Sequence, residues 1–171
     1  GADTFVYAAT TDLFATATAA LVDTIDGGSE IDALKLGTTG ATFTIANTNT
    51  WLRATAATVE KITVVANDFA YSITLEDLAS DAGLTTVDLS GDSNATGANV
   101  IDVSAETATA YTLTGSAGVD TITGGAGADV ISGGLDADLI TGNAGVDALT
   151  GGGGADTFVY AATTDLFATA T

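Results

Sequence analysis

The sequence is marked first by what it lacks: its 171 residues include no cysteine, histidine, proline or methionine. Without cysteine there is no disulfide and no thiol nucleophile, and without histidine there is no imidazole base and no histidine-bound metal. No apolar run approaches the roughly 20 residues that span a bilayer, so we expect no transmembrane segment. Because methionine is missing, we expect a piece of a longer reading frame.

Positive charge is almost absent as well. Three basic residues, Lys35, Arg53 and Lys61, stand against 22 acidic ones, and the formal net charge is −19. Such a chain repels itself unless counter-ions bind, and it has no basic patch that would bind nucleic-acid phosphates. A hydrophobic fraction of 46% is nevertheless typical of a folded protein. We therefore expect a folded chain that needs cations and has no nucleic-acid partner.

The chain repeats its own beginning. Residues 154–171 match residues 1–18, GADTFVYAATTDLFATAT, letter for letter, at an offset of 153 residues (154 minus 1). The identity predicts a window on a polypeptide that repeats with this period, in which Tyr7 and Tyr160 are the same position of successive modules. An artificial duplication is the alternative. Tandem modules favour self-association as the main kind of partnership.

A nine-residue period lies inside the long one. Residues 115–159 divide into five consecutive nonapeptides, GSAGVDTIT, GGAGADVIS, GGLDADLIT, GNAGVDALT and GGGGADTFV, and residues 27–35, GGSEIDALK, form a degenerate copy. Position eight is always apolar, and position six is always an aspartate. These aspartates are Asp120, Asp129, Asp138, Asp147 and Asp156, with Asp32 in the degenerate copy and Asp3 in the partial copy at the start.

The nonapeptide has a simple physical interpretation. Its glycines permit the positive-φ backbone of a tight turn, and its last three residues form a short strand whose middle residue points inward. Two nonapeptides make one coil, and stacked coils pair their strands in parallel. Equivalent turns are then 18 residues apart, which predicts that Asp120, Asp138 and Asp156 stack on one edge and that Asp129 and Asp147 stack on the other.

Such a roll has a thin core. Burying one apolar side chain in nine residues stabilises by about 1.5–3 kcal/mol, while fixing each residue of backbone costs roughly 1–2 kcal/mol. Acidic repulsion adds to this deficit. A hard cation removes both problems, because Ca²⁺ takes six to eight oxygen ligands from carboxylates and backbone carbonyls. The residues therefore predict a calcium-dependent fold.

The run GGxGxDxUx resembles the RTX (repeats-in-toxin) family. The resemblance implies an all-β parallel β-roll that holds Ca²⁺ between position-six aspartates and glycine carbonyls of neighbouring coils, in a bacterial protein secreted by the type I pathway. Ser116 and Asn143 replace the second glycine, and Glu30 and Asp136 replace the fourth; Asp136 either adds a ligand or loosens one turn. The implied carbonyl contributors are Gly115, Gly118, Gly124, Gly127, Gly133, Gly134, Gly151 and Gly153.

The remaining residues are rich in Val, Ile, Thr and aromatic residues, which favours strands. Two architectures fit: an irregular β-solenoid continuous with the roll, which we favour, or a β-sandwich joined to it. Helices are expected at Asp12–Leu21 and Leu75–Ala82. The expected strands are Ala41–Ala46, Val59–Ala66, Ala70–Leu75, Thr85–Leu89, Val100–Val103 and Tyr111–Leu113.

Four segments follow from these patterns. We expect the end of a preceding RTX block with a linker in residues 1–26, a solenoid-like segment in 27–114, the calcium-binding roll in 115–159 and the start of the next module in 160–171. No catalytic motif is present, and acids spaced nine apart in turns suit metal binding, so we expect no enzyme. The leading expectation is a secreted cell-surface structural protein, such as an S-layer, filament or matrix fibre. The alternative is a calcium-stiffened spacer of a large adhesin or ice-binding protein.

Overall fold

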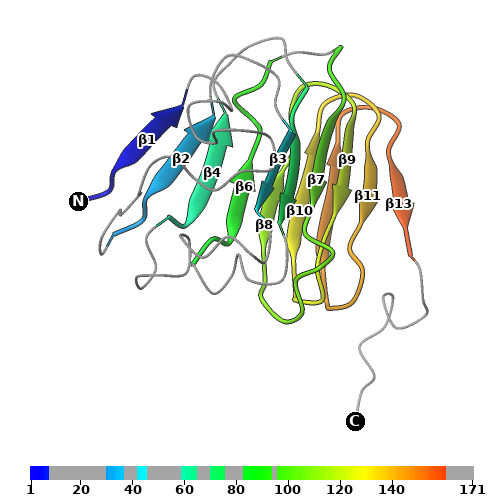
Figure 1. Ribbon diagram of the computed structural model, residues 1–171. Helices are drawn as coiled ribbons and strands as arrows, with labels where there is room; N and C mark the ends of the chain where they lie inside the picture. The colour runs from blue at the N-terminus through cyan, green and yellow to red at the C-terminus, as the bar shows by residue number, and fades with distance from the viewer. Residues whose placement is uncertain are drawn as a thin grey trace.

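Strands are the regular elements of the computed structural model, which describes residues 1–7, 30–36, 42–45, 59–64, 70–75, 83–93 and 96–160. They form two sheets, and from β2 onward successive strands alternate between them (Figure 1). Sheet one contains, in spatial order, β1 (Thr4–Tyr7), β2 (Ala33–Leu36), β4 (Lys61–Val64), β6 (Thr86–Asp88), β8 (Thr112–Thr114), β10 (Val130–Gly134) and β12 (Ala148–Gly152). Sheet two contains β3 (Thr42–Ile45), β5 (Ser72–Leu75), β7 (Asn99–Asp102), β9 (Asp120–Thr123), β11 (Leu139–Thr141) and β13 (Thr157–Val159).

All neighbouring strands in both sheets are parallel. A chain that alternates between two parallel sheets winds as a solenoid, so each coil contributes one strand to each sheet. The sheets also run without a break from β6 to β8 and from β7 to β9. The predicted continuous parallel solenoid is therefore confirmed, and the β-sandwich alternative is wrong, because a sandwich is built from antiparallel strands.

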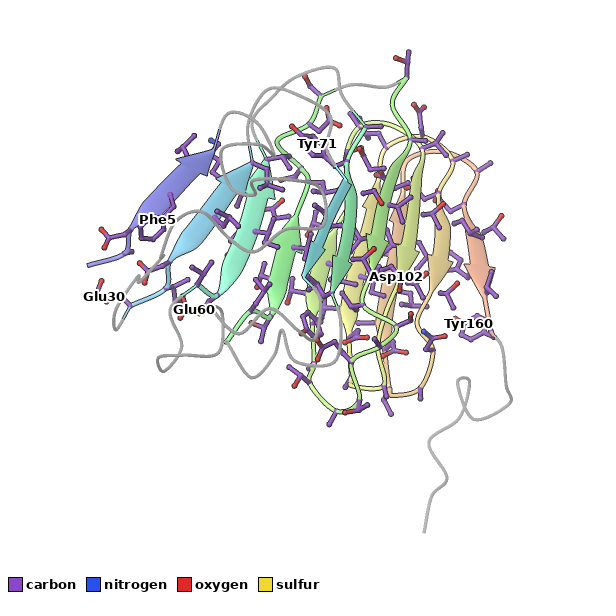
Figure 2. All side chains as sticks on the ribbon, in the orientation of Figure 1. Phe5, Glu30, Glu60, Tyr71, Asp102 and Tyr160 are labelled. Atoms are coloured by element: carbon purple, nitrogen blue, oxygen red, sulfur yellow. The ribbon has the colours of Figure 1, made fainter. Side chains whose placement is uncertain are left out.

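The core lies between the two sheets, where inward side chains meet (Figure 2). Strands such as β4, β5 and β7 alternate buried and less buried positions, as the period of two in a β-strand requires. In β5, for example, Ile73 and Leu75 are fully buried while Ser72 and Thr74 face outward. The sequence pattern of alternating apolar and hydroxyl residues thus directly produces the two-sheet packing.

Coils of two sizes share the axis. In residues 1–111, which we call the wide coils, the spacing of equivalent residues varies, from 25 between Lys61 and Thr86 (86 minus 61) to 30 between Thr42 and Ser72 (72 minus 42). In residues 112–160, which we call the narrow coils, equivalent residues such as Asp120 and Asp138 are 18 residues apart. The strands keep their register across the change, so the narrow coils continue the wide ones.

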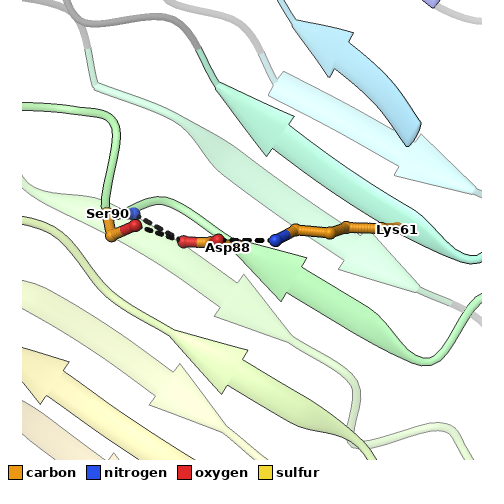
Figure 3. A network of polar contacts seen from close by, with 3 residues as sticks. All are labelled: Lys61, Asp88 and Ser90. Atoms are coloured by element: carbon orange, nitrogen blue, oxygen red, sulfur yellow. Dashed lines mark hydrogen bonds and ion pairs between the residues drawn. The ribbon is translucent and has the colours of Figure 1, made fainter. Parts of the chain in front are cut away.

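One ion pair joins neighbouring strands of the wide coils. The Lys61 ammonium on β4 lies 2.8 Å from an Asp88 carboxylate oxygen on β6, and the Ser90 hydroxyl and amide donate to the other oxygen (Figure 3). Burial acts to raise the pKa of Asp88, but the hydrogen bonds from Lys61 and Ser90 and the lysine charge outweigh it. The pKa of Asp88 is therefore lowered from 3.8.

Each of the six predicted strands contains or overlaps an observed strand, from β3 to β8. The predicted helix Asp12–Leu21 lies outside the described residues, and so does the predicted helix after Leu75, although Leu75 itself ends β5. The four predicted segments stay predictions, and the boundary after residue 26 lies outside the described residues. Across the part of the chain that the structure describes, no helix is long and apolar enough to cross a membrane.

Candidate metal centre

A line of polar side chains runs along each edge of the solenoid. Each lies at the start of a strand, in the register of nonapeptide position six, and we call the two lines the position-six ladders. On sheet one the ladder is Asp3, Asp32, Glu60, Thr85, Tyr111, Asp129 and Asp147; on sheet two it is Tyr71, Asn99, Asp120, Asp138 and Asp156. The expected stacking of the five aspartates at 18-residue steps is therefore found.

From Asp32 onward, ladder carboxylates accept a hydrogen bond from a backbone amide of the preceding coil. In the narrow coils the backbone N–H of Asp120 donates to Asp138 Oδ1 at 2.8 Å, and that of Asp138 donates to Asp156 Oδ1 at 3.1 Å. On the other edge, the N–H of Asp129 donates to Asp147 Oδ1 at 2.9 Å. The direction is always the same, because the side chain of the later coil accepts from the backbone of the earlier one.

The other carboxylate oxygen points into its own turn, against the position-one glycine. A Cβ placed on Gly124 would lie 2.5 Å from Asp129 Oδ2 and 2.7 Å from the carbonyl oxygen of Gly142 in the next coil. No side chain fits there, so glycine is required for steric reasons. The space is bounded by one carboxylate oxygen and one carbonyl oxygen, the donor types that Ca²⁺ prefers. Gly115 and Gly133 have the same arrangement, with Asp120 and Gly133 around the first and Asp138 and Gly151 around the second.

Asp138 is the clearest test of whether a cation fits. Its residue is 2% exposed, and among the described residues its Oδ2 atom has no hydrogen-bond donor. Burial raises the pKa of Asp138 to about 6, and the charges of Asp120, Asp156 and Asp136 add to the effect. A buried carboxylate oxygen that faces a carbonyl oxygen is unfavourable unless a proton or a cation lies between them. The residues therefore fit a hard divalent cation.

In the neighbouring ladder aspartates, Asp120 and Asp129, the Oδ2 atom has a hydrogen-bond donor. Asp120 Oδ2 accepts the Ser116 amide at 2.6 Å, and Asp129 Oδ2 accepts the Gly125 amide at 2.8 Å. Burial still raises the pKa of both carboxyl groups, partly offset by these hydrogen bonds. Asp138 thus has the strongest need for a cation among the three.

The remaining predicted ligands, which are not position-one glycines, differ in backbone conformation and in hydrogen bonding. Asp136 is exposed and has a left-handed backbone, with φ of 62°, as has Asn143 at 65°. Both substitutions therefore keep the turn that glycine would make, and Asp136 adds negative charge beside Asp138. The Gly134 carbonyl accepts the Gly153 amide at 2.9 Å, and a Cβ on Gly127 would meet the carbonyl of Thr109. The Gly118 amide donates to the Ser116 hydroxyl at 3.1 Å.

The degenerate copy also has a buried ladder acid. Asp32 is fully buried, accepts the Asp3 amide through Oδ1, and among the described residues has no donor to Oδ2. Its own amide donates to a Glu60 carboxylate oxygen at 2.7 Å. Nowhere in the described ranges do three acidic side chains gather closely enough to form a metal site by themselves. Backbone carbonyls would therefore have to complete any cation shell.

Sequence reasoning missed a polar cluster where the wide and narrow coils meet. The Asn99 side-chain amide donates to Asp92 Oδ2 at 3.2 Å and to the Ser116 hydroxyl at 2.8 Å, and all three residues are buried. Asn99 takes the ladder position before Asp120, so an amide stands in for a carboxylate at the first turn. The signal was the short internal repeat VDLSGD and IDVSAE at residues 87–92 and 101–106, which places Asp92 and Glu106 equivalently.

Comparison with known proteins gives one result. The model of the RTX calcium-binding nonapeptide repeat family (4 copies) matches residues 112–140, 126–158 and 133–165. Searches of curated proteins and of solved structures found no significant match. The matched residues include the whole of the narrow coils, residues 112–160, with their glycine turns.

Proposed function

Because residues 112–165 match the RTX calcium-binding nonapeptide repeat family, we propose that this chain is an extracellular structural module, one link of a bacterial cell-surface filament, S-layer or matrix fibre. RTX repeats are typical of secreted bacterial proteins and bind Ca²⁺ as a structural ligand rather than as a catalytic cofactor. The finer assignment to a polymer rests on the duplication of residues 1–18 at 154–171 in a solenoid that stacks along one axis. Solenoids of this kind extend by adding coils, since each coil contacts only its neighbours.

The observation that carries the calcium role is the orphan Oδ2 of Asp138 beside Gly133 and the Gly151 carbonyl. Bound there, Ca²⁺ would neutralise buried charge and tie neighbouring coils together through Asp138 and the glycine carbonyl oxygens. Extracellular calcium modules have dissociation constants of about 10⁻⁴–10⁻³ M, so the narrow coils would fold outside the cell and not in the cytosol. This difference suits export of an unfolded chain.

We propose a structural role rather than catalysis. The ladder acids are used to accept backbone amides of neighbouring coils, as Asp138 does for Asp120. The chain has neither histidine nor cysteine for a nucleophile–base pair. A second copy of the same chain is the proposed partner, and neither nucleic acid nor a membrane is expected to bind a chain of net charge −19.

The runner-up is a calcium-stiffened spacer that carries a separate adhesive or ice-binding tip. It is favoured by the outward-facing hydroxyls of sheet one, where Thr114, Ser132 and Thr150 lie in register on successive coils. In this role the modules would extend the chain without binding each other side by side or end to end.

Electron microscopy of the purified chain distinguishes the two roles. With millimolar Ca²⁺ we expect regular filaments or sheets, and with EGTA or with Mg²⁺ alone we expect none, because Mg²⁺ demands a stricter octahedron. Monomeric rods at all protein concentrations in Ca²⁺ would contradict the polymer and support the spacer. Absence of any calcium effect on the circular dichroism would contradict both.

A further inference from the structure

The first and last described segments of the solenoid carry the same seven residues, GADTFVY, in different surroundings. The first copy, residues 1–7, contains β1, which is paired along its length with β2 in sheet one. The second copy, residues 154–160, contains β13, the last described strand of sheet two. Phe5 packs against the core, whereas Phe158 is 40% exposed and Tyr160 is 46% exposed. Phe5 and Tyr160 lie at opposite ends of the molecule (Figure 2).

The first copy, which pairs with β2, shows which backbone groups of GADTFVY form hydrogen bonds with segment 30–36. The Ala2 amide donates to the Glu30 carboxylate at 3.0 Å, the Asp3 amide donates to Asp32 Oδ1, and the Ala33 amide donates to the Asp3 carbonyl at 2.9 Å. Pairing then runs in register from Thr4 opposite Ala33 to Tyr7 opposite Leu36. The segment 30–36 therefore recognises GADTFVY through backbone pairing and two acidic side chains.

The second copy presents the same backbone groups outward. The Thr157 amide donates inward to the Asp138 carbonyl at 2.8 Å. Because amides of successive strand residues point to alternate sides, those of Asp156 and Phe158 face away from β11. They are the counterparts of Asp3 and Phe5, which face β2 in the first copy. Among the described strands, none pairs with the outer edge of β13, and this edge has the same sequence as the edge of β1 that pairs with β2.

We propose that the edge formed by residues 155–160 binds the segment 30–36 of another copy of this repeat, with Thr157 opposite Ala33 and Tyr160 opposite Leu36. This inference rests on the proposed assembly of copies and identifies the contact between them, which we call the joint. It extends the position-six ladder, since Asp156 would stack on Asp32 of the next copy as Asp138 stacks on Asp156 here. The joint brings two carboxylates together, so it should require Ca²⁺ as the narrow coils do.

A half-turn between successive copies follows from the topology. β1 belongs to sheet one and β13 belongs to sheet two, although their sequences are identical. When β13 takes the place of β1, sheet two of one copy continues as sheet one of the next. Each copy is then rotated by half a turn about the solenoid axis relative to its neighbour. Surface features such as the Lys61–Asp88 pair should alternate between the two faces of the assembly, and the true axial repeat should contain two copies.

Disulfide trapping tests the register, because the chain has no cysteine of its own. The donor is the full chain with Val159→Cys, and the acceptor is the chain without residues 1–7 and with Lys35→Cys, so that its 33–36 edge is open. Val159 and Lys35 would be directly opposite, at the roughly 4.8 Å spacing of neighbouring strands, which a disulfide spans. The matched control acceptor carries Ala33→Cys, two residues out of register and on the same face, beyond the roughly 7 Å limit of a disulfide.

In Ca²⁺ we expect at least about tenfold more mixed dimer with Lys35→Cys than with Ala33→Cys, because only the former pair meets disulfide geometry. Adding Phe158→Pro to the donor should abolish the difference, since proline removes the outward amide and leaves the inward ones. Equal yields in both registers, or no mixed dimer with a folded acceptor, would overturn the proposal. If the truncated acceptor loses its circular dichroism, a full-length acceptor with Phe5→Pro and Lys35→Cys replaces it, since proline at residue 5 removes an amide that faces β2 and so opens the 33–36 edge; the same two outcomes decide.

The trapping result is independent of filament formation. A register-specific dimer without filaments under the microscope would support the joint and contradict the polymer. Filaments with no preference between the two acceptors would support the polymer and contradict the joint. The two-copy axial repeat in filament images is a further expectation of the half-turn, and a one-copy repeat would contradict it.

Discussion

The wide and narrow coils differ in how many apolar side chains each strand buries. The wide-coil strands β2, β4 and β5 each bury two apolar side chains, such as Ile73 and Leu75 in β5. A narrow-coil strand buries one, as β10 does with Ile131, and towards the C-terminal end Leu149 is only partly buried. The wide coils also bury the large side chains of Tyr71 and Tyr111. Both regions bury acidic side chains, but the narrow coils combine theirs with glycine turns and a smaller apolar core.

The energetic consequence follows from these counts. Full burial of an aliphatic side chain stabilises by about 1.5–3 kcal/mol, so each narrow strand forgoes about that much relative to a wide one. Glycine turns lose more backbone entropy on folding than other residues do. The buried ladder carboxylates of the narrow coils add a charge penalty, visible in the raised pKa of Asp138. We therefore expect bound calcium to supply in the narrow coils the stabilisation that the apolar core supplies in the wide ones.

Calcium removal should separate the two regions most strongly. We expect EGTA to abolish the amide-exchange protection of β9 to β13, together with most of their sheet circular dichroism, while Ile62, Ile73 and Val87 in the wide coils keep protected amides. Returned Ca²⁺ should restore the narrow coils. Hydrogen exchange read by mass spectrometry measures both regions in one sample. Equal protection of the narrow coils with and without Ca²⁺ would show that they need no metal.

Replacement of Asp138 should give opposite effects with and without calcium. Asp138→Asn removes a charge from between Asp120 and Asp156, so it should raise the calcium concentration at the folding midpoint by about tenfold, which corresponds to about 1.4 kcal/mol. In EGTA the same change should stabilise the narrow coils, because it relieves a buried repulsion. Asp129→Asn is the matched control and should shift the midpoint less, since Asp129 Oδ2 already accepts the Gly125 amide. Equal shifts for both variants in a calcium titration would contradict this ranking.

The sequence predicted the narrow coils well and the wide coils only in outline. Five nonapeptides in phase determined the strand positions, the inward Ile131 and the 18-residue stacking of Asp120 on Asp138, because every coil repeats the same local chemistry. The wide coils have no fixed period, so strands could be predicted from β-branched residues but their partners could not. The Asn99 and Asp92 cluster was missed for this reason: it depends on which turn stacks on which.

Acidity should stabilise the metal-free narrow coils. Folding raises the pKa of Asp138 to about 6 from an ordinary value of 3.8, and it also raises those of Asp120 and Asp129. A raised folded-state pKa contributes stability that is present below pH 3.8 and is lost as pH rises through about 6. In EGTA the thermal midpoint of the narrow coils should therefore be higher at pH 4.5 than at pH 7.5.

Calcium should reverse this pH dependence, because protons and Ca²⁺ compete for the same carboxylates. Bound Ca²⁺ should lower the pKa of Asp138 below the value of about 6 that burial gives it without metal. In saturating Ca²⁺ the midpoint should therefore fall only as acid displaces the cation, at a pH that moves further below 6 as the calcium concentration rises. Asp138→Asn should flatten the acid side of both curves, which separates the effect of this residue from the general loss of net charge. Parallel pH curves with and without Ca²⁺, measured by scanning calorimetry, would contradict the assignment of Asp138 to the calcium site.

The smallest effect should come from the ion pair of the wide coils. Lys61 and Asp88 have side chains that are 33% and 25% exposed, and pairs of this exposure contribute about 0–1 kcal/mol. Lys61→Met should therefore lower the urea midpoint of the wide coils slightly and leave the calcium midpoint of the narrow coils unchanged. The sign with pH is opposite to that of Asp138, since the lowered pKa of Asp88 gives stability that is present above pH 3.8 and is lost as the pH falls further. A clear shift in the calcium midpoint on Lys61→Met would mean that the stability of the wide coils affects the folding of the narrow ones. The two regions would then fold as a single cooperative unit, rather than one being stabilised by its core and the other by calcium.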